Sequence, residues 1–441
     1  MTSGQTDRSQ ELYERAQRSI TAGLHSNSRA RVPHPLYFNR ADGPFVWDVD
    51  GNRYIDLGMG NGAVMLGHNN PSIREAVATA MATGMSAGLE TETSVNAAEL
   101  FLKMVPSADR VRFTNTGTEA MLHALHMARA YTGRQAIAKI EGAYHGWFDS
   151  VYVSTWPVLA QAGPDDAPVA LPGTAGLMKS ATQDAVILPF NDSRATEQIV
   201  RRRAGDLAAI IVEPTLIDVG FIPAEREYLL TLRRLADETG ALLVFDELLT
   251  GFRLARGGAQ EHYNFRADLS IFGKALGNGF PVAAVAGQQK YLEISAPGAG
   301  RAAFVGTFNA HAVAMAVVQA SLAQLADGTV TAQLQARTQM LIREFQSLAA
   351  RHGVPAQMQG GGGHIHWYFT PEPVRNYRHA ARGSRERYAA FAGELADAGF
   401  LVSANYLLHH AISAAHGSAE MDHLMAAMDK GLAAAARVKV G

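Results

Sequence analysis

The sequence predicts an α/β fold in which a mainly parallel sheet is flanked by helices. Two continuous apolar runs, 208–212 and 241–245, each end at acidic residues. Runs of this length are typical of buried parallel strands. A helix over 229–240 leads into the second run, and a short strand over 109–114 passes through small residues into another helix. In such sheets, ligands bind outside the carboxyl ends of the strands, so the acidic residues mark the expected site.

Composition restricts the classes of function. The chain has 441 residues, of which 47% are hydrophobic and 18% are charged, which is typical of a globular protein with two or three packed domains. A formal net charge of −2 gives no electrostatic support for binding nucleic acid. The absence of cysteine excludes disulfides, thiolate metal sites and a cysteine nucleophile. The polar start and the lack of a run of roughly 20 apolar residues favour a cytoplasmic enzyme with no membrane segment.

An isolated lysine is the first candidate for catalysis. Lys274 follows a short apolar run and opens a glycine-rich turn with no other charge. Asp246 ends the strand over 241–245, 28 positions earlier, which leaves room for a loop and one more strand. A buried acid and a lysine at the same sheet edge suit pyridoxal 5′-phosphate: the lysine would form the Schiff base and the acid would keep the pyridinium nitrogen protonated.

A phosphate site is predicted where the strand over 109–114 meets its helix. Thr116, Gly117 and Thr118 lie in this turn, where backbone N–H groups, hydroxyls and the helix dipole can face an anion. The alternative is a capping box between Thr116 and Glu119 without any ligand. The lysine and the acid nearby favour the phosphate.

Two further strand ends carry candidate side chains. Tyr144 follows the strand over 136–139 and could stack on the pyridine ring, with a plain core aromatic as the alternative. Glu213 ends the strand over 208–212 and reaches the same edge, with a structural ion pair as the alternative. The segment 160–178 has no periodicity, and we expect a mobile loop over the mouth of the site.

Four motifs make the chain resemble the class III aminotransferases, which are fold-type I pyridoxal phosphate enzymes. The nearest branch includes glutamate-1-semialdehyde aminomutase and the D-phenylglycine and β-amino acid aminotransferases. The resemblance runs from about Tyr13 to the last helix. Its motifs are Asp-Glu-Leu-Leu-Thr-Gly-Phe-Arg at 246–253, Gly-Lys at 273–274, Asn-Thr-Gly-Thr-Glu-Ala at 115–120 and Gly-Thr-Phe-Asn at 306–309.

The resemblance implies the domains and most of the roles. It implies a large cofactor domain over 59–320, with a sheet of the seven-stranded type, and a small α+β domain built from 1–58 and 321–441. Lys274 and Asp246 would be catalytic, and Thr307 would reach the cofactor phosphate of the other subunit in a homodimer with shared active sites. The predicted cofactor-binding residues are Thr116, Gly117, Thr118, Tyr144, His145, Glu213, Asp246, Lys274 and Thr307.

The substrate prediction depends on one arginine. In the aminomutase-like branch an arginine from an irregular N-terminal segment meets a substrate carboxylate, and Arg29 matches that position, with Arg31 close by. An arginine can hold a carboxylate through two parallel hydrogen bonds. Tyr144 and Trp147 would give the pocket an apolar side, so we expect amino acids or oxo acids with a bulky or apolar group. The alternative is that Arg29 is a solvated loop charge.

The activity predicted is amino transfer between a small-molecule donor and an oxo acceptor. One alternative is a 2,1-aminomutase of the glutamate-1-semialdehyde type, although Leu408 occupies the place of that enzyme's glutamate. Another is a non-catalytic, regulatory pyridoxal phosphate-binding protein, which would not need both Asp246 and Lys274. No arginine lies between Ser403 and Ala415, so pyruvate or a simple amine donor carries equal weight with glutamate.

A metal site is not expected. His364 and His366 are spaced to lie on one face of a strand, as metal ligands can. No third ligand is evident nearby, and zinc needs three or four.

Overall fold

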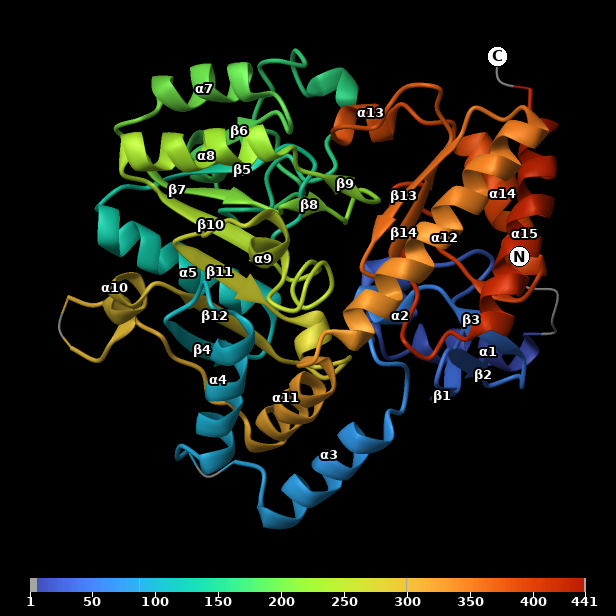
Figure 1. Cartoon of the computed structure of the whole chain (residues 1–441), viewed down its shortest axis with the longest axis horizontal. Coiled ribbons are helices and arrows are strands. Elements are labelled where there is room, and N and C mark those ends of the chain that lie inside the picture. The colour runs from blue at the N-terminus through green and yellow to red at the C-terminus, as the bar shows by residue number, and fades with distance from the viewer. Residues whose placement is uncertain (1–5, 87, 299, 440–441) are drawn as a thin grey trace.

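The computed structural model describes residues 6–86, 88–298 and 300–439. Its centre is a seven-stranded sheet in the order β4-β12-β11-β10-β7-β5-β6 (Figure 1). Only β12 runs antiparallel to its neighbours, so the predicted α/β fold with a mainly parallel sheet is confirmed. The strands are β4 (Arg110–Thr114), β5 (Ala136–Ile140), β6 (Ala185–Leu188), β7 (Leu207–Val212), β10 (Leu242–Glu247), β11 (Leu269–Phe272) and β12 (Ala283–Gly287).

Helices cover both faces of this sheet, which explains why its central strands are apolar throughout. Every residue of β7 and β10 is buried. α5 (Gly117–Thr132) packs on one face against β7, β11 and β12. On the other face α8 (Arg226–Thr239) packs against β7 and β10, with α7 (Ser193–Arg202) beside it. α5 and α8 each end at a glycine in the left-handed conformation, and the N–H of Gly133 donates to the carbonyl of Arg129 at the end of α5.

A second region brings together the two ends of the chain (Figure 1). The N-terminal strands join a C-terminal strand in the sheet β1-β2-β3-β15, where β3 and β15 are parallel. A three-stranded antiparallel sheet, β13-β14-β16, lies beside it. The elements are β1 (Phe38–Asp42), β2 (Phe45–Asp48), β3 (Arg53–Asp56), β13 (Gln357–Gly361), β14 (His364–Tyr368), β15 (Phe400–Leu401), β16 (His410–Ala411), α12 (Thr329–His352), α14 (Arg385–Asp397) and α15 (Ser418–Ala436).

Further helices and short elements complete the two regions and the segments between them. They are α1 (Asp7–Ala16), η1 (Thr21–Gly23), η2 (Asn27–Arg29), α2 (Met59–Gly62), α3 (Pro71–Thr83), α4 (Glu92–Met104), η3 (Leu159–Gln161), α6 (Lys179–Gln183), β8 (Thr215–Leu216), β9 (Ile222–Pro223), α9 (Ala259–Tyr263), η4 (Lys274–Leu276), α10 (Gln289–Leu292), η5 (Glu293–Ser295), α11 (Ala312–Leu325) and α13 (Tyr377–Ala381). The predicted loop over 160–178 is irregular after η3.

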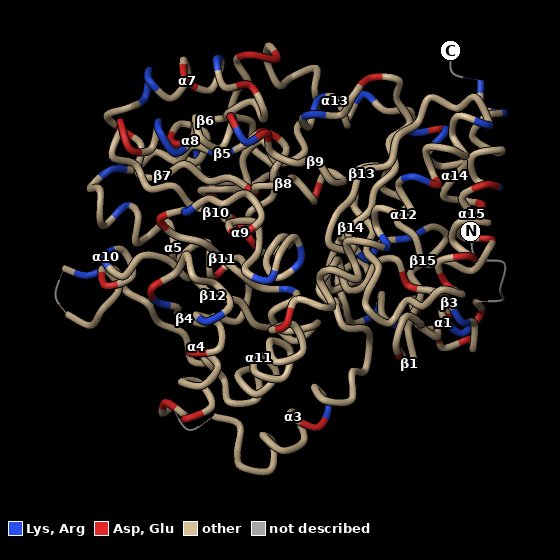
Figure 2. The backbone as a smooth tube through the Cα atoms, in the orientation of Figure 1, with Lys and Arg blue, Asp and Glu red and all other residues tan. Residues whose placement is uncertain are grey.

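Charge is unevenly shared among the helices. Both signs are interspersed on α7 and α8, whereas α11 carries no charged residue (Figure 2). Across the described ranges, no single helix is long and apolar enough to cross a membrane. The bent pair of α11 and α12, which meet at 66°, passes that test by length and composition only.

Candidate active site

A cavity of about 160 Å³ lies at the carboxyl edge of the parallel strands. Strands β5, β7, β10 and β11 end here, and the N-terminus of α5 faces it. Of the ten residues predicted for the site, all but Thr116, Thr307 and Arg29 line the cavity. Its lining residues are Gly117, Thr118, Tyr144, His145, Gly146, Glu213, Asp218, Asp246, Leu248, Leu249, Ile271 and Lys274.

Strand register brings the predicted acid and lysine together. β10 and β11 are parallel neighbours, and Glu247 pairs with Phe272 at their ends. Asp246 therefore lies at the end of one strand, while Lys274 lies just beyond the end of the next. The backbone of Lys274 adopts the left-handed conformation, with φ of 48°. Both side chains line the same cavity, although 28 positions separate them in the sequence.

Asp246 is held by two hydrogen bonds. The ring of His145 contacts it, with 2.7 Å between Nδ1 and Oδ2, and the backbone N–H of Leu248 donates to Oδ1 at 3.0 Å. Burial lowers the pKa of His145, and the hydrogen bond to Asp246 opposes this only in part. A neutral imidazole can donate a hydrogen bond from Nδ1 to the carboxylate of Asp246. Nε2 of His145 is buried and has no hydrogen-bond partner among the described residues.

The start of α5 has both a capping box and residues that could bind a phosphate. Thr116 is the N-cap in a capping box: its hydroxyl accepts from the N–H of Glu119 at 3.2 Å, and Glu119 accepts from the N–H of Thr116 at 3.3 Å. Gly117 and Thr118 line the cavity one and two residues further on. A Cβ atom added at Gly117 would lie 2.2 Å from Cδ2 of Leu248, so a larger residue would require the Leu248 side chain to move. The first N–H groups of a helix lack intrahelical acceptors and suit an anion.

Two more carboxylates line the cavity. One oxygen of Glu213 accepts from the N–H of Ile217 at 3.1 Å, and the other is buried without a partner in the described chain. Burial, followed by the charges of Asp218 and Asp246, raises the pKa of Glu213 well above its ordinary value. Burial also raises the pKa of Asp218, while Lys274 opposes that shift. Sequence reasoning missed Asp218, although it lies only five residues beyond Glu213, in the turn between β8 and β9.

Aromatic side chains border the cavity at Tyr144. Its ring stacks on that of Trp156, with centroids 5.7 Å apart and planes 3° apart. Trp147, predicted to line the pocket, is instead 72% exposed and lies outside the cavity wall. The apolar side of the cavity comes from Leu248, Leu249 and Ile271 as well as Tyr144.

Thr307 and Arg29 lie outside this cavity. Thr307 is exposed in a turn before α11, and Arg29 is exposed at the end of η2. The nearby Arg31, unlike Arg29, has a side-chain hydrogen-bond partner among the described residues: its guanidinium donates to the carbonyl of Val402 at 3.4 Å. Burial lowers the pKa of Arg31. The roles predicted for Thr307 and Arg29 therefore depend on contacts beyond the cavity of one chain.

The histidines of β14 do not assemble a metal site. Within the described residues, no group of three or more histidine, cysteine, aspartate or glutamate side chains could hold a metal ion. His364 packs edge-on against His409, with ring centroids 4.9 Å apart. Nε2 of His366 lies 3.0 Å from the carbonyl of Tyr406.

This geometry agrees with what comparison with known proteins shows. The family model for class-III aminotransferases matches residues 26–406. The chain is a class-III aminotransferase. This aminotransferase is 37% identical over 419 residues to a glutamate-1-semialdehyde 2,1-aminomutase from Methanothrix thermoacetophila, with 95% of each chain covered.

Solved structures give the same family. An omega-transaminase from Sphaerobacter thermophilus superimposes with a TM-score of 0.91 at 33% identity, covering 98% of this chain and 100% of the other. A β-phenylalanine aminotransferase from Variovorax paradoxus superimposes with a TM-score of 0.85 at 29% identity, covering 96% and 93%. The predicted family, enzyme class and fold type are thereby confirmed.

Class-III aminotransferases use pyridoxal 5′-phosphate, so the predicted cofactor is also confirmed. The residues present fit it. The aminotransferase offers a helix start where a Cβ atom would clash, an acid held by His145, a lysine, and an unpartnered oxygen on Glu213. The helix start suits the phosphate, and the acid suits the ring nitrogen. The lysine suits the aldehyde, and the oxygen of Glu213 suits a further polar group.

Proposed function

We propose that Lys274 and Asp246 carry out amino transfer between an amino acid or amine and a keto acid or aldehyde in this class-III aminotransferase. One observation carries the proposal. The lysine and the histidine-bound acid face a single cavity from adjacent parallel strands. Amino transfer needs an amine that can exchange with the substrate and an acid that holds the cofactor ring protonated.

Each residue has a definite task in this scheme. When bound, pyridoxal 5′-phosphate supplies an aldehyde that condenses with amines and a ring that accepts the electrons released at the substrate carbon. Nζ of Lys274 would hold the cofactor aldehyde when no substrate is bound, and would move a proton to and from the substrate carbon. The carboxylate of Asp246 would hold the proton on the ring nitrogen through a hydrogen bond. His145 orients Asp246 through the hydrogen bond at Oδ2.

The cofactor phosphate would bind at the start of α5. Gly117 and Thr118 supply N–H groups that face the cavity, and the helix dipole favours an anion there. Thr116 supports them by capping the helix. Tyr144, His145 and Glu213 would complete the cofactor site, since all three line the same cavity.

The enzyme would act as a homodimer with shared active sites. The turn that carries Thr307 also exposes Val305 at 76% and Phe308 at 58%, and such apolar exposure suits a covered surface. Thr307 would reach the partner's cofactor phosphate. We also propose the domain division 1–58 with 321–441 and 59–320, which the shared sheet of β1, β2, β3 and β15 supports.

Substrate carboxylates would be recognised by Arg29. The side chain is exposed, and the described structure gives it no acidic partner, so its guanidinium is available for a ligand. With the apolar residues Leu248, Leu249 and Ile271 in the cavity wall, this favours amino acids or oxo acids with a bulky or apolar group.

Borohydride reduction followed by peptide mass spectrometry tests the assignment of the lysine. We expect the cofactor to be attached to Lys274. Lys139 is the rival, because burial lowers its pKa to about 7. However, Nζ of Lys139 donates to the carbonyls of Ala143 and Val153 at 2.8 and 2.7 Å, so it is already engaged. A label on Lys139 would overturn the proposal.

An aminomutase is the second candidate, because the curated relative at 37% identity is one. In a mutase, amine and carbonyl belong to one molecule, so turnover needs no separate amino acceptor. Leu408 argues against this candidate, since the glutamate expected there is replaced by an apolar residue. Steady-state turnover of glutamate 1-semialdehyde without an added acceptor would favour the mutase. Turnover that depends on two substrates would favour the aminotransferase.

A further inference from the structure

The ring of Tyr144 is supported on one side by a second aromatic residue. Trp156 stacks on it with the two planes 3° apart. Tyr152 meets it edge-on, with centroids 6.1 Å apart. Tyr144 lines the cavity, whereas Trp156 and Tyr152 do not. Residues outside the cavity therefore contribute to the orientation of the Tyr144 ring, together with Thr118 of the cavity wall, which its hydroxyl contacts.

Trp156 is itself held in a conformation that bulky residues rarely adopt. Its φ is 47°, in the left-handed region. The indole N–H donates to the carbonyl of Asp218 at 3.2 Å, and Asp218 is a cavity residue. The hydroxyl of Tyr377 donates to the carbonyl of the next residue, Pro157, at 2.7 Å. A backbone held in a sparsely populated region persists only where the surroundings determine it, and such positions cluster at functional sites.

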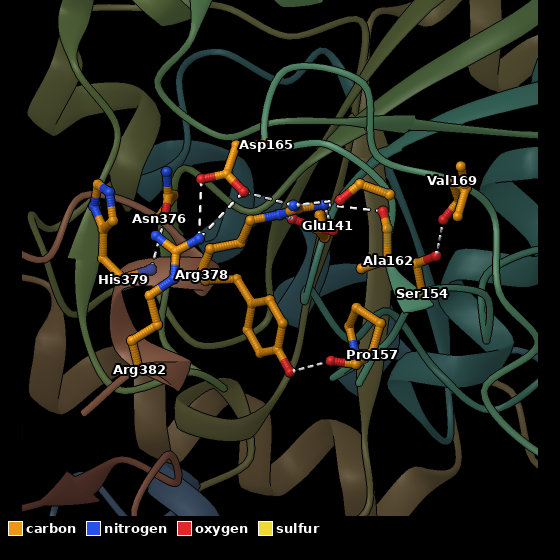
Figure 3. A network of polar contacts seen from close by, with 12 residues as sticks. Glu141, Ser154, Pro157, Ala162, Asp165, Val169, Asn376, Arg378, His379 and Arg382 are labelled. Atoms are coloured by element: carbon orange, nitrogen blue, oxygen red, sulfur yellow. Dashed lines mark hydrogen bonds and ion pairs between the residues drawn. The ribbon is translucent and has the colours of Figure 1, made fainter. Parts of the chain in front are cut away.

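A network of polar contacts around Arg378 of α13 binds the chain on both sides of the segment that carries Trp156 (Figure 3). The side chain of Arg378 is 5% exposed and binds both oxygens of Glu141, at 2.7 and 2.8 Å. It also donates to the carbonyls of Ala162 and Gly163, at 2.9 and 2.8 Å, and to Asp165 at 2.7 Å. Glu141 precedes Tyr144, and the other acceptors follow Trp156. One buried guanidinium therefore binds both flanks of the segment that carries the stacked pair.

The packing of α13 against this segment is close. A Cβ atom added at Gly142 would lie 2.5 Å from the ring of Tyr377. Lys139 binds the carbonyls of Ala143 and Val153, which draws the two arms of the segment together between those flanks. The segment predicted from the sequence to be a mobile loop is thus anchored to α13 at Ala162, Gly163 and Asp165.

We infer that Trp156 is a positioning residue that holds the plane of the Tyr144 ring at the cofactor site, and that Arg378 holds Trp156 in place from α13. The inference rests on the proposed function, because it takes Tyr144 to lie against the cofactor ring. Stacking on Trp156 limits the tilt of the Tyr144 ring, which the edge contact with Tyr152 does not fix by itself. The C-terminal part of the chain thereby controls an aromatic wall of the active site.

Substitutions at Trp156 test whether this residue holds the plane of the Tyr144 ring. In the cofactor-loaded enzyme, Trp156→Ala should weaken cofactor binding about threefold to tenfold in equilibrium dialysis. It should also at least halve the visible circular dichroism per bound cofactor, a signal that a loss of stability alone does not change. Trp156→Phe keeps an aromatic ring and should stay within about twofold of wild type in both measurements. Equal effects of the two substitutions, or no effect of either, would overturn the inference.

Substitutions on α13 test whether Arg378 holds Trp156 in place. Arg378→Lys keeps a charge beside Glu141 but loses the fork that binds it. Arg378→Lys should reduce the visible circular dichroism per bound cofactor as Trp156→Ala does. The variant that carries both substitutions should lose no more of this signal than the variants that carry one. Arg382→Ala is the matched control: Arg382 binds the same Asp165 but is 54% exposed, and it should change neither measurement by more than about twofold. Additive effects would show that Arg378 does not act through Trp156.

Failure of this inference is distinguishable from failure of the proposed function. A wild-type protein that carries no cofactor on Lys274 would remove the proposed function. A wild-type protein that carries it there, with Trp156→Ala indistinguishable from wild type, would remove only the inference.

Discussion

Replacing Asp246 by alanine removes a carboxylate that His145 and the backbone N–H of Leu248 hold in place. The side chain is 6% exposed, so solvent screens its charge poorly. The nearest alternative acids, Glu213 and Asp218, have raised pKa values, chiefly because of burial, and are poor substitutes for a fixed negative charge. Asp246→Ala should therefore affect both the rate and the stability of the protein.

The size of the rate effect follows from the lost charge. A unit charge interacts with an opposite charge about 4 Å away by about 4 kcal/mol at the effective dielectric constant of protein sites. At 1.36 kcal/mol per factor of ten, the half-reaction should slow about a thousandfold. The buried Nδ1–H of His145 also loses its acceptor, which should lower the free energy of unfolding by about 1–3 kcal/mol.

Single-turnover kinetics with an amino donor, followed by the spectral change of the cofactor, measure the rate effect. Cofactor occupancy must be determined in the same samples. Glu247→Gln is the matched control, because Glu247 is the next residue of β10 and binds the N–H groups of Ala259 and Gln260 at 2.6 and 3.1 Å instead of lining the cavity. It should change the rate by less than about threefold, since alternate strand residues face opposite sides. An Asp246→Ala enzyme with full occupancy and a rate within tenfold of wild type would refute the reasoning.

Three further predictions concern substrate, assembly and pH. Arg29→Ala should lower kcat/KM about tenfold to a hundredfold for carboxylate substrates and leave a carboxylate-free amine unchanged; equal effects on both would contradict the role. Light scattering of the active enzyme should show a dimer, and Thr307→Ala should weaken cofactor binding; a fully active monomer would contradict this. Burial lowers the pKa of His410 to about 3, and its Nε2 accepts from the N–H of Ser403 at 3.1 Å. Because an unfolded histidine titrates near 6.5, the free energy of unfolding falls as the pH drops below that value, by about 2 kcal/mol at pH 5. In denaturant unfolding, His410→Gln should lose about 2 kcal/mol less than wild type between pH 7 and pH 5.

The position of the cavity was predictable because parallel strands end in register. Apolar runs identified β7 and β10, and the residues that follow parallel strands gather at one sheet edge. Asp246, Glu213 and Lys274 could therefore be placed together from the sequence alone. The turn at Thr116 was predictable only as two alternatives, because a capping box and an anion site need the same residue types. The structure shows the capping box at Thr116, with Gly117 and Thr118 left to line the cavity.

The support for Tyr144 was not predictable, because it depends on contacts between distant segments. Arg378 and Glu141 are 237 positions apart, and Tyr377 and Pro157 are 220 apart. In the sequence, Arg378 is one of several arginines in a polar stretch, and Trp156 lies in a segment without periodicity. Nothing local marks either residue as buried or stacked. Residues that set side-chain orientation from outside a cavity leave no pattern along the chain, whereas residues at strand ends do.

The charge within the cavity bears on the choice of substrate. Three carboxylates line it, and Lys274 is the lining residue with a cationic side chain, since burial keeps the ring of His145 neutral. Lys274 is engaged by the cofactor in the proposed function, and the start of α5 by its phosphate. A substrate carboxylate entering this cavity therefore finds no counter-charge in the wall that one chain builds from its described residues. The cation has to come from a segment outside that wall. Arg29 suits this role better than Arg31, because the guanidinium of Arg31 already reaches the carbonyl of Val402.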